Sequence, residues 1–166
     1  MHSVFNLEQT TLSEEVLPIF APHVSIEELL QKHGVVISHF GGRAYYTNRD
    51  DSIVLPPQAT FKSRENYYAV LLHELTHWTG TQARLNRACW AGYSTSDKAR
   101  AEEELVAEIG SLFLTAYFNI DGELEQHASY VESWKTILSE REIVRAVTQA
   151  TKAFAWLIGE DKATHS

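Results

Sequence analysis

Two histidines and a glutamate lie within one apolar run of the sequence, with a spacing typical of zinc hydrolases. The motif is His73-Glu74-Leu75-Thr76-His77. On a helix, residues four apart share a face, so both imidazoles could reach one metal ion. Glu74 would lie near the same point and could accept a proton from metal-bound water. The motif therefore predicts a Zn²⁺ centre that activates water, the chemistry used to hydrolyse peptide bonds.

A third metal ligand is required, because a catalytic zinc ion usually takes three protein ligands and one water. A second helical run offers carboxylates for this position at Glu103, Glu104 and Glu108. Glu104 and Glu108 are four apart and share a helix face. One of them could bind the metal while the other accepts the free N–H of a ligand histidine, which would fix the tautomer of that histidine. Glu103 is a further candidate for the ligand position.

Two predicted helices must hold these side chains. Ser63 can cap the first helix and Gly80 can end it, and the second helix spans about residues 97–118 before Asp121-Gly122. Apolar residues recur in both at spacings of three and four, which is typical of a helix with one buried face. The recurring residues are Tyr67, Val70, Leu71, Leu75 and Trp78 in the first helix, and Leu105, Ile109, Leu112, Phe113, Ala116 and Tyr117 in the second.

Other elements are predicted on both sides of these two helices. A capping box at Ser25-Ile26-Glu27-Glu28 opens a short helix that ends at Gly34. Three short strands follow, separated by turn residues, and they indicate an antiparallel sheet whose third strand lies at an edge because prolines follow it. Two more helices are predicted near the C-terminus. The strands are residues 35–40, 44–47 and 52–55, and the late helices are residues 124–138 and 143–157.

The fold class predicted is therefore α+β, with a small antiparallel N-terminal sheet followed by a helical body that carries the histidine motif. At 166 residues the chain suits one domain over residues 1–166, within which residues 1–24 are poorly defined.

Composition limits the partners and the compartment. Twenty-two acidic against 14 basic residues give a net charge of −8, which argues against non-specific nucleic-acid binding. The single cysteine, Cys89, excludes an internal disulfide and fits a reducing compartment. The sequence has no signal-like segment and no apolar run long enough to span a bilayer. We expect a soluble, cytoplasmic protein with no membrane partner.

The motifs together resemble a known family. The helix with the two histidines, followed by a helix bearing glutamates, is similar to the gluzincin branch of the zincin metallopeptidases. A closer resemblance is to the metallopeptidase domain of ArdC-type antirestriction and polyvalent proteins, and it covers about residues 30–158. The residues that carry it are Asp51-Ser52-Ile53-Val54-Leu55-Pro56, Tyr67-Tyr68-Ala69, the run at 71–80, Arg84-Leu85-Asn86-Arg87, the run at 103–110 and His127-Ala128-Ser129-Tyr130.

The resemblance implies a role for each residue of the site. His73, His77 and Glu104 would be the zinc ligands, and Glu74 would be the base. Glu108 is then expected in hydrogen-bond contact with a ligand histidine and is the alternative to Glu104 as ligand. Proteins of the ArdC type also carry an N-terminal domain that binds single-stranded DNA. Too few residues precede the predicted sheet to encode that domain, so we expect no nucleic-acid binding from this chain alone.

Several residues outside the proposed ligand set allow more than one interpretation. Zincins often use an additional histidine or tyrosine to stabilise the oxyanion, and His127 or Tyr130 could serve, with Tyr93 as a further candidate. His127 is equally compatible with a core histidine that has a hydrogen-bond partner. Trp90 could line a substrate cleft or cover the core, and we interpret Cys89 as structural.

The function expected is that of a zinc-dependent metallopeptidase, associated with phage- or plasmid-type mobile elements, that acts on a protein or peptide substrate. By analogy with related zincins, the strand at 52–55 could pair with an extended peptide along its edge. Two alternatives stay open. One is a non-catalytic metal-binding module that acts by binding a partner, and the other is an antirestriction module that mimics DNA.

Overall fold

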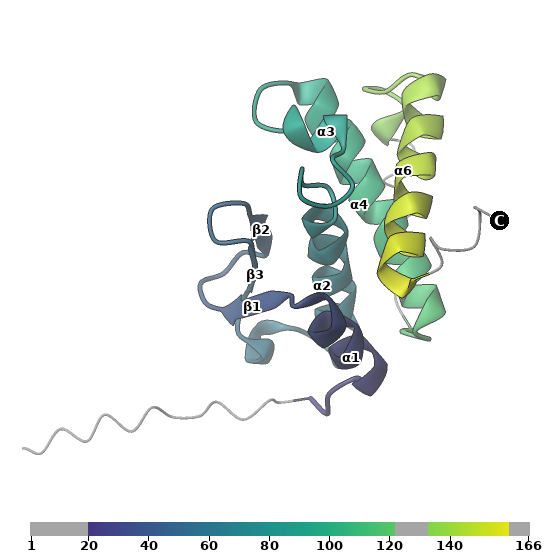
Figure 1. Ribbon diagram of the computed structural model, residues 1–166. Helices are drawn as coiled ribbons and strands as arrows, with labels where there is room; N and C mark the ends of the chain where they lie inside the picture. Colours follow the sequence, from purple (N-terminus) through teal and green to yellow (C-terminus); the bar gives the residue numbers. More distant parts are fainter. Residues whose placement is uncertain (1–19, 122–132, 160–166) are drawn as a thin grey trace, which may run out of the picture.

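A mixed three-stranded sheet and a stack of helices make up the computed structural model, which describes residues 20–121 and 133–159. Figure 1 shows α2 lying between the sheet and α4, with α6 against the outer side of α4 and α1 below α2. The helices are α1 (Val24–His33), α2 (Arg64–Trp78), α3 (Ala88–Ala91), α4 (Asp97–Tyr117) and α6 (Glu140–Ile158), and a 3₁₀ turn covers Gln58–Thr60.

The predicted α+β class is confirmed, but the predicted antiparallel order of the strands is wrong. The strands are β1 (Val36–His39), β2 (Tyr45–Thr47) and β3 (Ser52–Leu55), in the spatial order β1-β3-β2. β1 pairs with β3 in parallel, and β2 pairs with β3 antiparallel. The turn after β1 does not close a hairpin, because the backbone N–H of Phe40 continues the pairing with β3 by donating to Leu55 O at 2.9 Å.

β3 is the central strand of this sheet rather than an edge strand. All four of its residues are buried, which explains the apolar run Ile53-Val54-Leu55, since a strand covered on both faces has no polar alternation. Pro56-Pro57 follow the last paired residue, so their missing N–H groups remove no bond from the ladder. Because neighbours occupy both sides of β3, the predicted pairing of a peptide with this strand is ruled out.

The two helices that carry the site begin as the sequence predicted. Ser63 caps α2 by accepting a hydrogen bond from the backbone N–H of Asn66 at 3.0 Å. Ser96 caps α4 in the same way, through Ala99 N at 3.2 Å. The two helices pack face to face in the middle of the helical stack.

The predicted capping box of the first helix is wrong. α1 begins at Val24, and its N-cap residue His23 makes no side-chain capping bond. The carboxylate of Glu27 instead accepts a hydrogen bond from the hydroxyl of Tyr68 at 2.8 Å, which ties α1 to α2. Gly34 does end the helix, in the left-handed conformation, as predicted.

Of the two helices predicted near the C-terminus, the second is confirmed and the first lies mostly outside the described residues. The helix expected at 143–157 is confirmed as α6, which opens with a capping box formed by Ser139 and Glu142. The helix expected at 124–138 lies largely outside the described residues. Among the residues that the structure describes, no helix is long and apolar enough to cross a bilayer.

Gly110 sets the separation of α2 and α4. A Cβ at this position would lie 2.5 Å from Cγ2 of Thr76, closer than carbon atoms can pack. We expect Gly110→Ala to lower the free energy of unfolding by about 1–3 kcal/mol, because the overpacked helices must move apart. Denaturant unfolding measures this effect. The matched control is Gly42→Ala, where nothing lies within 4 Å of the added Cβ, and an equal loss in both variants would contradict the close packing.

Candidate metal centre

α2 presents His73 and His77 to the same region of space. Their ring centroids lie 4.9 Å apart, as expected for residues one turn apart on one helix face. The side chain of His73 is 21% exposed and that of His77 only 6%. One ligand side of the site is therefore open to solvent while the other is covered by protein.

Glu104 on α4 completes the group. Its Oε2 lies 3.5 Å from Nε2 of His73, and its Oε1 lies 3.6 Å from Nε2 of His77. Two ligand atoms each about 2.1 Å from a tetrahedral ion lie about 3.4 Å apart, so the 3.5 Å between His73 Nε2 and Glu104 Oε2 suits a shared metal. Among the described residues, His73, His77 and Glu104 form the group whose ligand atoms all lie within 4.8 Å of one another. Two imidazoles and one carboxylate are a donor set that fits zinc and other divalent transition metals.

Glu103 fixes the orientation of the His77 ring. The Nδ1 atom of His77 lies 3.1 Å from Oε1 of Glu103, and because a carboxylate only accepts, Nδ1 carries the proton. Nε2 faces Glu104 and the metal position, where a bound metal would take the place of its proton. From the sequence, a contact of this kind is expected of Glu108, with Glu103 only as an alternative ligand. Glu108 lies one helical turn further along α4 and is outside the three-residue group.

Arg87 neutralises the buried charge of Glu103. Glu103 is completely buried, and Arg87 is 2% exposed. The guanidinium donates through Nε to Oε2 at 2.9 Å and through Nη2 to Oε1 at 2.5 Å. It also donates to Thr79 Oγ1 at 2.6 Å and to Thr76 O at 2.7 Å, which anchors it to the end of α2. Sequence reasoning missed this pair, which joins residues from two different elements.

Two more residues complete the packing around Arg87 and Glu103. The thiol of Cys89 donates to Oε2 of Glu103 at 3.0 Å, in keeping with the structural role predicted for it. Burial and the carboxylate of Glu103 raise the pKa of Cys89 to about 12, so the thiol stays protonated. Gly80 leaves room for the guanidinium, because a Cβ there would lie 2.6 Å from Nη2 of Arg87.

The electrostatics of the site favour a cation. Burial alone would lower the pKa of His77, but the carboxylates of Glu103 and Glu104 outweigh burial and raise that pKa to about 9. Burial opposes ionisation of Glu104 too, yet hydrogen bonds with His73, His77 and Tyr93 hold its pKa far below the usual range. The ionised carboxylates thus stabilise positive charge at the His77 ring, and a bound metal would supply that charge in place of a proton.

Glu74 lies beside this group and is 8% exposed. Burial is the main cause that raises the pKa of its carboxyl group, and the nearby charge of Glu104 adds to the effect. His77 and His73 oppose the shift, as does a hydrogen bond from the backbone of Tyr46 in β2. The sheet therefore contacts the metal-binding helix at the residue predicted to be the base.

The aromatic residues of the α3 region border the same site. The Trp90 ring lies 5.8 Å from the His77 ring, 5.6 Å from Tyr93 and 5.3 Å from Tyr46. Trp90 thus covers His77 and also packs against the main core. The hydroxyl of Tyr93 donates a hydrogen bond to Oε1 of Glu104.

Two of the residues predicted to stabilise the oxyanion, His127 and Tyr130, fall in 122–132, outside the described residues. Their role stays a prediction.

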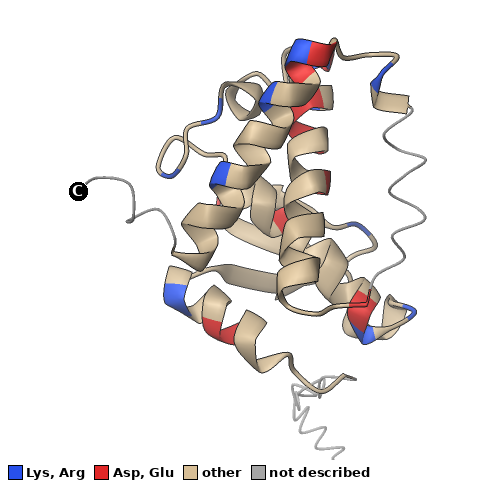
Figure 2. Cartoon of the chain, turned by 90° about the vertical axis from the view of Figure 1, so that its right-hand side faces the viewer, with Lys and Arg blue, Asp and Glu red and all other residues tan. Residues whose placement is uncertain are grey.

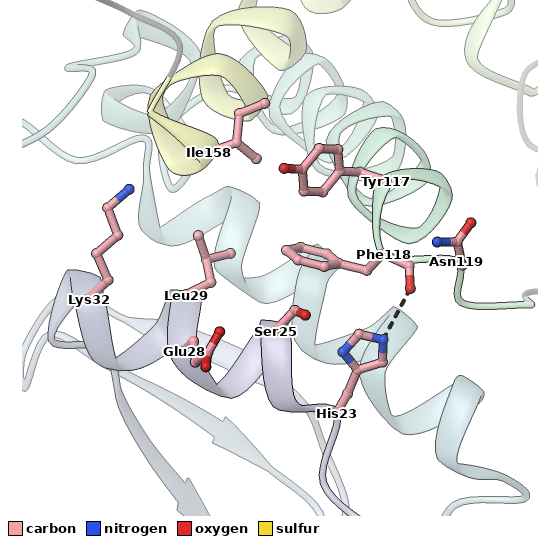
Figure 3. A pocket seen from close by; sticks show the side chains of 9 residues that line it. All are labelled: His23, Ser25, Glu28, Leu29, Lys32, Tyr117, Phe118, Asn119 and Ile158. Carbon is pink, nitrogen blue, oxygen red and sulfur yellow. Dashed lines mark hydrogen bonds between the residues drawn. The ribbon is translucent and has the colours of Figure 1, made fainter.

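A hollow of about 670 Å³ lies among the described residues, between α1 and the ends of α4 and α6 (Figure 3). Its lining includes His23, Lys32 and Tyr117 but no residue of the metal group, so it is a separate feature of the surface.

Comparison with known proteins agrees with this arrangement. The family model described as a zincin-like metallopeptidase matches residues 24–152. The solved structure of the antirestriction ArdC protein from plasmid R388 in its Mn(II)-bound form is 37% identical, with a TM-score of 0.71 over 87% of this chain and 55% of that one. The metal-free form of the same protein gives 36% identity and a TM-score of 0.65 over 88% of this chain and 53% of that one.

Similar curated proteins are larger than this chain. Two proteins named DNA primase TraC from Escherichia coli are 38% identical over 80% of the chain and 43% identical over 76%. The chain covers only 9% and 12% of their lengths. The protein y4eC of Sinorhizobium fredii is 32% identical over 94% of the chain, which spans 52% of it. The match of the family model to most of the chain, together with the group formed by His73, His77 and Glu104, shows that this chain belongs to the zincin-like metallopeptidase family.

Proposed function

We propose that this chain is a zinc-dependent peptidase that cleaves a protein or peptide substrate. The observation that carries the proposal is the place of Glu74, a buried carboxylate next to the three candidate ligands. A site that only binds metal needs three or four ligands and no additional carboxylate beside them. A site that hydrolyses a bond needs a base within reach of the attacking water.

The residues of the chain have separate roles in this reaction. A Zn²⁺ ion held by His73, His77 and Glu104 would lower the pKa of a bound water towards about 7 and polarise the substrate carbonyl. Glu74 accepts the proton of the attacking water and passes it to the departing amine.

The metal selectivity of the site gives a test. We expect Zn²⁺ to bind more tightly than Mn²⁺, because two imidazoles and one carboxylate follow the usual order of divalent affinities. Competition against a chromophoric chelator measures both dissociation constants in the same buffer. The similar ArdC protein was solved with Mn(II), so tighter binding of Mn²⁺ by this chain would contradict the assignment to zinc.

Peptide hydrolysis tests the proposal as a whole. Purified protein loaded with Zn²⁺ is incubated with a mixed peptide library, and new termini are identified by mass spectrometry. We expect cleavage that stops when a chelator removes the metal and returns when Zn²⁺ is added back. Stoichiometric zinc with no cleavage in the library would contradict the peptidase proposal.

The names of the similar proteins support a place in plasmid-type mobile elements, and the single thiol of Cys89 supports a reducing cytoplasm.

A second function, a non-catalytic antirestriction module, is supported by the structural similarity to ArdC. The chain spans only about half of that protein. It could have this activity only if the half that the two proteins share is sufficient for antirestriction. Transformation of a restricting host, with the chain expressed beforehand, distinguishes the two functions. Protection that survives Glu74→Gln but not His73→Ala would favour the binding module. Figure 2 shows acidic residues distributed over several elements with basic residues among them, which gives no support to mimicry of DNA.

A further inference from the structure

Tyr93 reaches the metal centre from outside the two helices that supply the ligands. It lies in the connection between α3 and α4, and its hydroxyl donates to Oε1 of Glu104. The residue is itself held in place, because the backbone O of Tyr93 accepts a hydrogen bond from Nε of Arg100 at 3.3 Å. The Arg100 guanidinium also lies 5.7 Å from the centre of the Tyr93 ring, and Trp90 packs against the ring.

This hydrogen bond makes the two oxygens of Glu104 unequal. Oε1 accepts a hydrogen bond from the Tyr93 hydroxyl, which is not a candidate ligand, whereas Oε2 faces Nε2 of the candidate ligand His73 at 3.5 Å, a contact in which a bound metal would replace the proton. An oxygen that keeps a strong hydrogen bond when the metal binds is a poorer ligand than the other oxygen of the carboxylate, since part of its charge is already neutralised. We therefore expect Glu104 to bind a metal through Oε2 alone.

Single-oxygen binding matters for the chemistry. A carboxylate that binds with both oxygens takes two coordination positions, whereas a catalytic site needs three protein ligands and one open position. We propose that Tyr93 is a positioning residue that directs Glu104 to bind the metal through Oε2 only and so keeps one coordination position open. The inference rests on the metal centre of the proposed function but not on peptide hydrolysis.

Cobalt(II) gives a direct test, since its visible spectrum reports coordination number. The full chain is prepared as wild type, as Tyr93→Phe and as the control Tyr117→Phe, a residue of α4 that is 54% exposed and lies outside the metal group. We expect Tyr93→Phe to weaken Co²⁺ affinity about tenfold to a hundredfold. Its visible absorption should also weaken as the coordination number rises. The control should match wild type in both measurements.

Three results would overturn the inference. They are a Co²⁺ affinity of Tyr93→Phe within threefold of wild type, an unchanged visible spectrum despite weaker binding, and an equal effect in Tyr117→Phe. The peptidase proposal can fail independently. If the chain gives the expected cobalt results but cleaves no peptide, the role proposed for Tyr93 stands and the peptidase function does not. A wild-type chain that binds no Co²⁺ overturns the metal centre and the role of Tyr93 together.

Discussion

Glu74→Gln should reduce the rate of peptide hydrolysis by about 10²–10⁴-fold, the contribution typical of a general base. The amide is nearly isosteric with the carboxylate but cannot accept the proton of the attacking water. Glu74 is not one of the three residues grouped around the metal position, so the affinity for Zn²⁺ should stay within a few-fold of wild type. Initial rates on a peptide cut by the wild type, together with metal titrations, measure both quantities.

The matched control for this variant lies on the same helix. Glu65→Gln makes the same chemical change in the first turn of α2, at the end remote from the histidines, and should leave the rate unchanged. Hydrolysis by Glu74→Gln at the wild-type rate would show that the activity comes from another residue or from a contaminating peptidase. Loss of metal together with activity would instead make Glu74 part of the metal site.

Arg87→Met should be strongly destabilising. It removes the guanidinium that pairs with Glu103, whose side chain is 0% exposed, and leaves that charge buried beside His77. Breaking a buried pair on one side costs about 3–5 kcal/mol, because Glu103 loses its permanently charged partner, keeps only His77 and Cys89 among the described residues, and cannot reach water. Denaturant unfolding of the metal-free protein measures the loss, and metal titration shows whether the His77 ring has also lost its orientation.

Two controls separate this effect from the removal of a positive charge in general. Lys98→Met removes a cation that is 68% exposed and paired with Glu142 at 3.4 Å, and it should cost less than about 1 kcal/mol. The double variant Arg87→Met with Glu103→Gln should recover part of the stability, because it removes the stranded charge. An Arg87→Met protein no less stable than Lys98→Met would contradict the role assigned to the pair.

Local signals in the sequence predicted the parts of the site that depend on local structure. Apolar spacing predicts α2 and α4, Ser63 marks the start of α2, and the four-residue spacing of His73 and His77 follows from the helix itself. Glu104 was found because a third ligand was required, and because the resemblance to a family indicated which glutamate. The geometry agrees with that choice, since Glu104 lies between the two histidines.

The features that sequence reasoning missed depend on contacts between distant segments. The parallel pairing of β1 with β3 has no turn signal, because β2 lies between them in the sequence and on the far side of β3 in space. Glu103 and Glu104 are adjacent, and only the packing of α4 decides that one faces His77 Nδ1 while the other faces the metal position. Arg87 is the same residue type as Arg84, three positions before it, and only the folded chain shows that Arg87 is the one buried against Glu103.

Anomalous diffraction at the zinc edge, from crystals of the zinc-loaded chain, tests the metal centre most directly. We expect a single strong peak about 2.1 Å from Nε2 of His73, Nε2 of His77 and Oε2 of Glu104. Glu103 should remain bonded to Nδ1 of His77 and lie outside the coordination sphere. A peak bound by Glu103 or Glu108 in place of Glu104, or no peak at the two histidines, would contradict the account.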